Sequence, residues 1–345
     1  MLKMSDIASH AGVSPTTVSF VLNERHETLR ISEKTRLKVL QAAEELGYRS
    51  NGLARAMRTG NTKMLGVLGG HTAEEQVGRM LAGALEAADA QGYTLKLLRL
   101  HAFGSAQQVI RRISELRLMG MLALHLPDAV LGELHVEARE YHTPLVLMDA
   151  RCDNPEITQV VSDDEGGIAA GVDHLAKLGH SKIAFIGDSK STLGSARKAA
   201  FCAAMARHGL EMPPSAIQEG SFSVRDLSLD AARALLSLAP TLRPTAVVCS
   251  GDLIALAALQ VAQELQLRVP LDVSVIGFAN LTASEYATPQ LTTIEQPFFE
   301  MGRTAVDLLL NSIGGDTGKP EDSCSGVKVL PTRLIERSST APRRR

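Results

Sequence analysis

The sequence contains no tryptophan, and aromatic residues make up only 3% of its 345 positions. It also lacks any run of about 18 apolar residues, so no membrane-spanning helix and no membrane partner are expected. The first residues, 1–6, have no apolar core of the kind that a secretory signal requires. These absences favour a cytoplasmic protein.

The four cysteines, Cys152, Cys202, Cys249 and Cys324, are scattered and form no C-x-x-C pair. This spacing favours reduced thiols in a cytosolic chain over disulfides or a metal centre. The ten histidines form no H-E-x-x-H cluster, and the segment 187–191 lacks the full frame of a phosphate-binding loop. We therefore predict no metal, no cofactor and no enzymatic activity.

The N-terminus contains a pattern of two short helices joined at Gly12, a residue that permits a tight turn. Ser14 is placed to cap the second helix. The apolar positions that would pack together are Ile7, Ala8 and Ala11 on the first helix and Val18, Val21 and Leu22 on the second. The outward positions of the second helix are Pro15, Thr16, Ser19, Phe20 and Asn23. Their sizes suit base edges and phosphates in a DNA major groove.

A third helix is predicted over 33–46, where Ser32 is a candidate cap and Gly47 ends the pattern. Its expected core positions are Leu37, Leu40, Ala43 and Leu46. The following segment, 50–60, is too short for a stable free helix. Residues 1–63 carry ten basic and six acidic residues, a net charge of +4, although the whole chain carries −2. A basic head on an acidic body suits a polyanionic partner for the head.

From Met64 onward, short apolar strands alternate with amphipathic helices in two series. The expected strands are 64–70, 94–100, 119–126, 144–149 and 159–162 in the first series, and 182–187, 216–222, 246–250 and 273–278 in the second. Such alternation predicts an α/β body of two lobes with parallel sheets. Ligands of such lobes gather beyond the carboxyl ends of the strands.

Several motifs together resemble the lactose-repressor (LacI/GalR) family of bacterial transcription regulators. They are the segments 6–23, 46–51, 174–180, 197–201 and 289–297. The resemblance implies an all-α helix-turn-helix head and a periplasmic-binding-protein-like body. It also implies a homodimer in the cytoplasm, associated with the nucleoid, that binds double-stranded operator DNA and a small-molecule effector.

On this resemblance we expect a DNA-binding domain at 1–49, a hinge helix or linker at 50–61, and an effector-binding and dimerisation domain at 62–345. The N-lobe would comprise about 62–160 and 292–322, and the C-lobe about 161–291 and 323–338. The residues after Glu336 contain no heptad segment for assembling a tetramer, and this basic tail is expected to be disordered.

The resemblance places Pro15, Thr16 and Phe20 at base-reading positions. Relatives often have Arg where Phe20 stands; Arg forks onto guanine, whereas Phe offers only apolar contact, for example to a thymine methyl. The operator should therefore differ from those of Arg-bearing relatives, unless Phe20 packs inward and reads no base. The expected DNA-contacting residues of the head are Ser14, Pro15, Thr16, Thr17, Ser19, Phe20 and Asn23.

The segment 53–58 resembles the hinge helix that orders on operator DNA. Met57 stands where relatives commonly place a leucine that wedges into the minor groove. A plain linker over 50–60 is the alternative. The expected hinge contacts with DNA are Asn51, Leu53, Ala54 and Met57.

Four residues are expected at an effector site between the lobes. Asp149 ends a predicted strand and offers a carboxylate, and Arg197 matches a ligand-binding arginine of the family. Phe222 stands where relatives carry an aromatic residue, and Gln296 falls near a crossover. The alternatives are that Asp149 caps a turn, that Arg197 pairs with a surface acid, and that Phe222 belongs to the core.

Two departures from the family pattern affect this site: Ser250-Gly251-Asp252 and Gly277-Phe278-Ala279-Asn280. An amide and a carboxylate that commonly hold sugar hydroxyls are missing at Gly251 and Ala279. Each lost hydrogen bond would cost a polyol ligand on the order of 1–3 kcal/mol. The effector's identity stays open between a sugar derivative, an anion held chiefly by Arg197, and a weakened or absent response.

The sequence thus predicts a sequence-specific DNA-binding transcription regulator, a repressor that binds a palindromic operator as a dimer. Its operator affinity would be modulated by a small molecule between the lobes. An activator or an effector-independent regulator is the alternative. A solute-binding protein of the transport type is a remote one, because it would need an export signal and would have no DNA-binding head.

Overall fold

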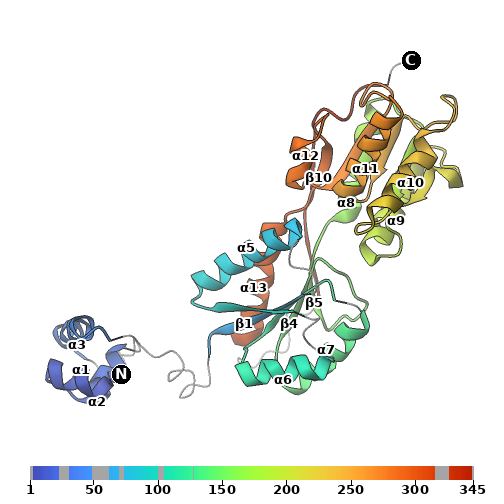
Figure 1. Cartoon of the computed structure of the whole chain (residues 1–345). Helices are drawn as coiled ribbons and strands as arrows, with labels where there is room; N and C mark the ends of the chain where they lie inside the picture. Colours follow the sequence, from blue (N-terminus) through green and yellow to red (C-terminus); the bar gives the residue numbers. More distant parts are fainter. Residues whose placement is uncertain are drawn as a thin grey trace. The chain divides into compact units, whose positions relative to one another are not determined.

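The computed structural model describes residues 3–22, 31–48, 62–69, 74–99, 105–126, 128–314 and 326–343. These form two compact units, one ending at Thr62 and the other beginning at Lys63 (Figure 1). The first unit is a head of helices, and the second is a body built on two sheets. None of the helices described is both long and apolar enough to cross a membrane.

The head consists of α1 (Met4–Ala11), α2 (Pro15–Leu22) and α3 (Glu33–Glu45). Gly12 ends α1 in the left-handed conformation, at a φ of 63°, and Ser14 Oγ accepts a hydrogen bond from the Thr17 amide at 3.0 Å. Both agree with the predicted turn and cap. The predicted apolar faces of the first two helices form the core, in which Leu22 is partly buried.

The predicted core face of α3 was wrong in part. Leu37 and Leu40 are 56% and 37% exposed, and Val39 and Ala42 are buried instead, together with Ala43. The predicted and the observed buried positions both recur at helical spacing. Periodicity alone therefore does not decide which of two neighbouring faces of α3 packs into the core. The face that packs against α1 and α2 carries Val39, Ala42 and Ala43.

The N-lobe is a six-stranded sheet in the order β11-β5-β4-β3-β1-β2. Its strands are β1 (Met64–Gly69), β2 (Thr94–Arg99), β3 (Met121–Leu124), β4 (Leu145–Met148), β5 (Thr158–Ser162) and β11 (Val327–Leu330), and every pairing is parallel. One face is covered by α5 (Glu75–Ala90) and α13 (Phe298–Gly314). The other is covered by α6 (Ala106–Leu116) and α7 (Asp128–Glu140).

The C-lobe is a second sheet of six strands in the order β12-β10-β9-β8-β6-β7. Its strands are β6 (Ile183–Gly187), β7 (Ile217–Glu219), β8 (Ala246–Cys249), β9 (Ser274–Ala279), β10 (Thr292–Glu295) and β12 (Arg333–Ile335), and β12 runs antiparallel to β10. α8 (Asp164–Lys177) and α9 (Thr192–Arg207) cover one face. α10 (Arg225–Leu236) and α11 (Asp252–Glu264) cover the other, and the short α12 (Thr282–Tyr286) follows β9.

The sheet pairings correct the predicted lobe boundaries. The segment 292–322 is predicted to lie in the N-lobe; its helix α13 does, but β10 pairs with β9 of the C-lobe. The segment 323–338 is predicted to lie in the C-lobe; its strand β12 does, but β11 pairs with β5 of the N-lobe. The chain therefore passes between lobes after β5, after β10 and between β11 and β12. An isolated strand pattern does not reveal which sheet edge it joins.

The C-terminal stretch is a second correction, because residues 337–343 lie along the C-lobe. The Val275 amide donates to the Ser339 carbonyl at 2.9 Å. Ser339 is fully buried, and its hydroxyl donates to the Val275 carbonyl at 2.6 Å. His180 lies 3.0 Å from the Ala341 carbonyl oxygen. These contacts satisfy backbone groups of the sheet that would otherwise lack partners.

Candidate functional sites in the head and between the lobes

The first candidate site is the surface of α2. Ser14, Pro15 and Thr16 are exposed, whereas Thr17, Ser19 and Phe20 are half-buried. Phe20 lies outside the core cluster of the described head residues, so its ring is partly available to a partner. Ser14 acts locally, because its hydroxyl caps α2. Asn23 lies outside the described residues.

The predicted hinge residues Asn51, Leu53, Ala54 and Met57 also lie outside the described residues.

The second candidate site lies where the chain crosses between the lobes, and it begins at Asp149 after β4. Asp149 is 4% exposed and adopts a φ of 51°. A non-glycine residue in this conformation is strained and persists where its surroundings hold it. Its carboxylate lies 3.1 Å from His125 Nε2 and accepts a long contact of 3.5 Å from Gln296 Nε2. Gln296 also donates to Ser162 Oγ at 2.8 Å.

Two opposing effects act on the pKa of His125. Burial lowers the pKa of this imidazole. The hydrogen bond and negative charge of Asp149, together with the charge of Glu74, raise the pKa by more than burial lowers it, so the net shift is upward. The buried Asp149 carboxylate thus stabilises the protonated form of His125 on the N-lobe side of the crossing.

Arg197 occupies the C-lobe side of this crossing and is 4% exposed. Its Nε donates to Asp164 Oδ2 at 2.7 Å, and its Nη1 donates to the Ser250 carbonyl at 2.7 Å. The guanidinium carbon lies 3.9 Å from the Phe278 ring centroid and 6.0 Å from that of Phe222. The alternative of a surface acid is wrong, since Asp164 is itself buried. Two nitrogens of the Arg197 guanidinium therefore already donate hydrogen bonds to protein groups.

Asp164 joins the two halves into one network. Ser162 Oγ donates to Asp164 Oδ1 at 2.5 Å, and Ser162 also accepts from Gln296. Hydrogen bonds thus run from Asp149 through Gln296, Ser162 and Asp164 to Arg197. The sequence prediction found both ends and Gln296 but missed Ser162 and Asp164. The signal was available, because Ser162 ends a buried strand and Asp164 follows two residues later at the start of α8, close to a strand end as Asp149 is.

Phe222 lies against Gly251, at one of the two departures from the family pattern. A Cβ atom at Gly251 would stand 2.9 Å from the Phe222 ring, so the half-buried ring fills the space from which a side chain at 251 would project. The Phe222 amide donates to Asp188 Oδ2 at 3.1 Å. Nearby, Ser250 Oγ is buried and has no hydrogen-bond partner among the described residues. An aromatic surface near Arg197 therefore occupies the space beside Gly251.

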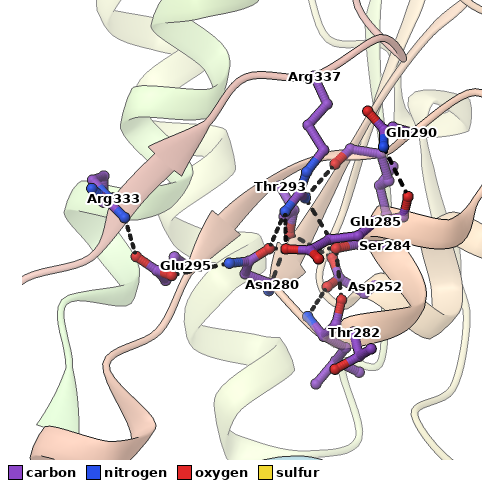
Figure 2. Close-up of polar contacts among 12 residues, drawn as sticks. Asp252, Asn280, Thr282, Ser284, Glu285, Gln290, Thr293, Glu295, Arg333 and Arg337 are labelled. Carbon is purple, nitrogen blue, oxygen red and sulfur yellow. Dashed lines mark hydrogen bonds and ion pairs between the residues drawn. The ribbon is translucent and has the colours of Figure 1, made fainter.

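Ala279, the second departure, precedes a polar cluster that Figure 2 shows. Asn280 Oδ1 accepts from Arg337 Nη2 at 2.8 Å, and Asn280 Nδ2 donates to Glu295 Oε1 at 3.0 Å. Glu295 in turn accepts from Arg333 Nη2 at 2.8 Å. Since Glu295 ends β10 and Arg333 begins β12, this cluster ties the end of β9 to two of the crossing segments.

Comparison with known proteins decides the family. Residues 3–51 match the model of bacterial regulatory proteins of the lacI family, and residues 172–340 match that of a periplasmic binding protein-like domain. The chain is 35% identical to the HTH-type transcriptional repressors PurR of Erwinia tasmaniensis and Escherichia coli, over 99% of its own length and 97% of theirs. It belongs to the lacI family of bacterial regulatory proteins.

Solved structures of lacI-family proteins agree with the fold described here. A lac repressor dimer bound to operator and the anti-inducer ONPF has a TM-score of 0.81 at 28% identity, with 99% of both chains covered. A complex of the transcriptional regulator CelR with cellobiose has a TM-score of 0.71 at 28% identity, covering 98% of this chain and all of that one. The predicted family, two-lobed architecture and class of transcription regulator are thereby confirmed, and the relatives are regulators rather than enzymes.

Proposed function

We propose that this lacI-family protein represses transcription in the bacterial cytoplasm by binding a palindromic operator as a homodimer. The observation that carries the proposal is the similarity, over 99% of both chains, to a lac repressor dimer bound to operator. The helix-turn-helix head supports it, because α2 carries short exposed residues and a partly available aromatic ring. A segment spanning 50–61, including Asn51, Leu53, Ala54 and Met57, would order on the minor groove.

Exposed apolar side chains on the C-lobe support the dimer. Val224 and Leu227 at the start of α10 are 48% and 43% exposed, Leu253 at the start of α11 is 54% exposed, and Tyr286 at the end of α12 is 82% exposed. α10 and α11 lie side by side on one face of the C-lobe sheet, and each carries exposed apolar residues at its start (Figure 1). Exposed apolar groups of this kind favour self-association. A monomeric mass in sedimentation equilibrium would contradict it.

Phe20 provides the test of the DNA-reading surface. We expect Phe20→Ala to weaken binding to a selected operator by about tenfold, since burying roughly 55 Å² of apolar surface contributes about 1.4 kcal/mol. Affinity for random duplex DNA should stay unchanged, because phosphate contacts dominate it. Fluorescence anisotropy with both duplexes measures the two affinities.

Leu37→Ala is the matched control, because Leu37 is exposed but lies on α3. An equal loss for both duplexes, or no loss with the Phe20 variant, would show that Phe20 does not read bases.

The effector is proposed to contact Asp149, Arg197, Phe222, Gly251, Ala279 and Gln296. The side chains present favour a ligand with an apolar or aromatic body that lies on Phe222 and a group that Arg197 can bind. Neutral polyols are disfavoured, because Gly251 and Ala279 offer no polar side chain. A thermal-shift screen with neutral hexoses, sugar phosphates and organic acids checks this, and stabilisation by the hexoses alone would overturn it.

A further inference from the structure

A second set of polar contacts joins the lobes away from the Arg197 network. Glu75, in the first turn of α5 in the N-lobe, accepts hydrogen bonds from the Thr282 amide at 3.0 Å and from the Thr282 hydroxyl at 2.7 Å. One turn along α5, Arg79 Nη1 donates to the Asn280 carbonyl at 2.9 Å. Arg79 and Glu75 also pair with each other at 2.6 Å. Two side chains of one lobe thus bind a short stretch of the other.

On the C-lobe side, the backbone amide of Thr282 needs a hydrogen-bond acceptor from outside its own helix. Thr282 is the first residue of α12, so its amide has no acceptor within the helix. The preceding residue, Leu281, makes no side-chain cap. Glu75 therefore supplies, from the opposite lobe, the cap that the local sequence does not provide.

The backbone that receives these contacts is held firmly by the C-lobe. The Leu281 amide donates to Asp252 Oδ2 at 2.7 Å, and the Asn280 side chain binds Arg337 and Glu295 (Figure 2). Through Glu295 and Arg333 the same cluster reaches two crossing segments. A movement of one lobe against the other would therefore break the contacts of Glu75 and Arg79 rather than be absorbed by a mobile loop.

We propose that Glu75 and Arg79 form a latch that holds the lobes together at this edge without a bound molecule, and that this latch sets the lobe arrangement on which basal operator affinity depends. The inference rests on the proposed function. The Arg197 network agrees with it, since Arg197 and Asp149 are both buried and bound to protein groups. An effector would then act by breaking or reinforcing an arrangement that the chain already makes for itself.

Hydrogen exchange and operator binding test the latch in the full-length protein, without added small molecules. In Glu75→Ala and Thr282→Val we expect amide exchange to become about tenfold faster both in α12 and at residues 78–82 of α5, with operator affinity altered by a similar factor. Thr282→Val keeps the backbone amide and removes only the hydroxyl, so it guards against misfolding. Glu86→Ala is the control, because Glu86 also lies on α5 but its carboxylate lies 4.0 Å from Arg303 of the same lobe.

Faster exchange in both elements and altered operator affinity in the Glu75 and Thr282 variants, with neither in the control, would support the latch. Faster exchange confined to α12 would mark Glu75 as a local cap and overturn it, as would an unaltered operator affinity. A wild-type protein that binds no operator would instead count against the proposed function, and the exchange measurement would still decide on the latch.

Discussion

Asp252 shows how burial gives one residue a distinct chemistry. It is almost fully buried at the start of α11, where its carboxylate accepts hydrogen bonds from Thr293 and from the Leu281 amide. Burial raises its pKa to about 6, because the desolvation of the charge outweighs those hydrogen bonds and the attraction of Arg337. The folded protein therefore holds this proton over a range in which the unfolded chain releases it.

This pKa predicts a specific pH dependence of stability. Between the unfolded value of 3.8 and about 6, the folded state binds more protons, so the Asp252 contribution to the free energy of unfolding falls as pH rises. The fall should reach up to about 3 kcal/mol, since one pKa unit corresponds to ~1.4 kcal/mol. Urea unfolding of wild type and Asp252→Asn from pH 4 to 7 measures it as a difference between the two proteins. A difference that is constant across this range would show that Asp252 titrates normally.

At this scale the sequence predicted residue types better than their partners. Asp149, Arg197 and Gln296 were found because each stands at a recognisable position, and the structure joins them in one network. That Arg197 binds Asp164 was not predictable, because the pairing depends on how the crossing after β5 meets α9. Nor does the sequence show that His125 lies next to Asp149, since the two residues follow different strands.

Among the helices, α5 and α13 make an unusually close contact. A Cβ atom at Gly83 of α5 would lie 1.9 Å from the Phe299 carbonyl oxygen, and one at Gly302 of α13 would lie 1.9 Å from the Met80 carbonyl oxygen. The two glycines thus let the helix backbones touch, and α5 is the helix that carries the latch residues. This contact could not be predicted from the sequence, because a glycine within a helical pattern can serve several structural roles.

A pair of glycine substitutions in α5 tests this packing. Gly83→Ala should lower the free energy of unfolding by about 2–3 kcal/mol, because the added methyl would overlap backbone atoms that cannot move aside easily. Gly78→Ala is the control, since a Cβ there would meet nothing within 4 Å. That variant should be more stable than wild type by up to ~1 kcal/mol, from helix propensity alone. Equal effects of the two variants in chemical denaturation would refute the close contact.

At the scale of the whole molecule, the two lobes are interleaved rather than consecutive. The alternating pattern from Met64 onward predicted two parallel-sheet lobes, and the sheets confirm them. The pattern did not show that β10 belongs to the C-lobe and β11 to the N-lobe. Both strands come after the regular alternation of strands and helices has ended. These late crossings bring Gln296, Glu295 and Arg333 between the lobes. A change in the lobe arrangement would therefore alter the hydrogen bonds of these residues.

We propose that a dimer of this chain uses its paired heads to read a symmetric DNA site. Selection of bound sequences from random duplex DNA by the purified full-length protein tests it most directly. We expect enrichment of an inverted repeat whose half-sites lie about one helical turn apart. Enrichment of a single unrepeated site, or of no sequence, would contradict it.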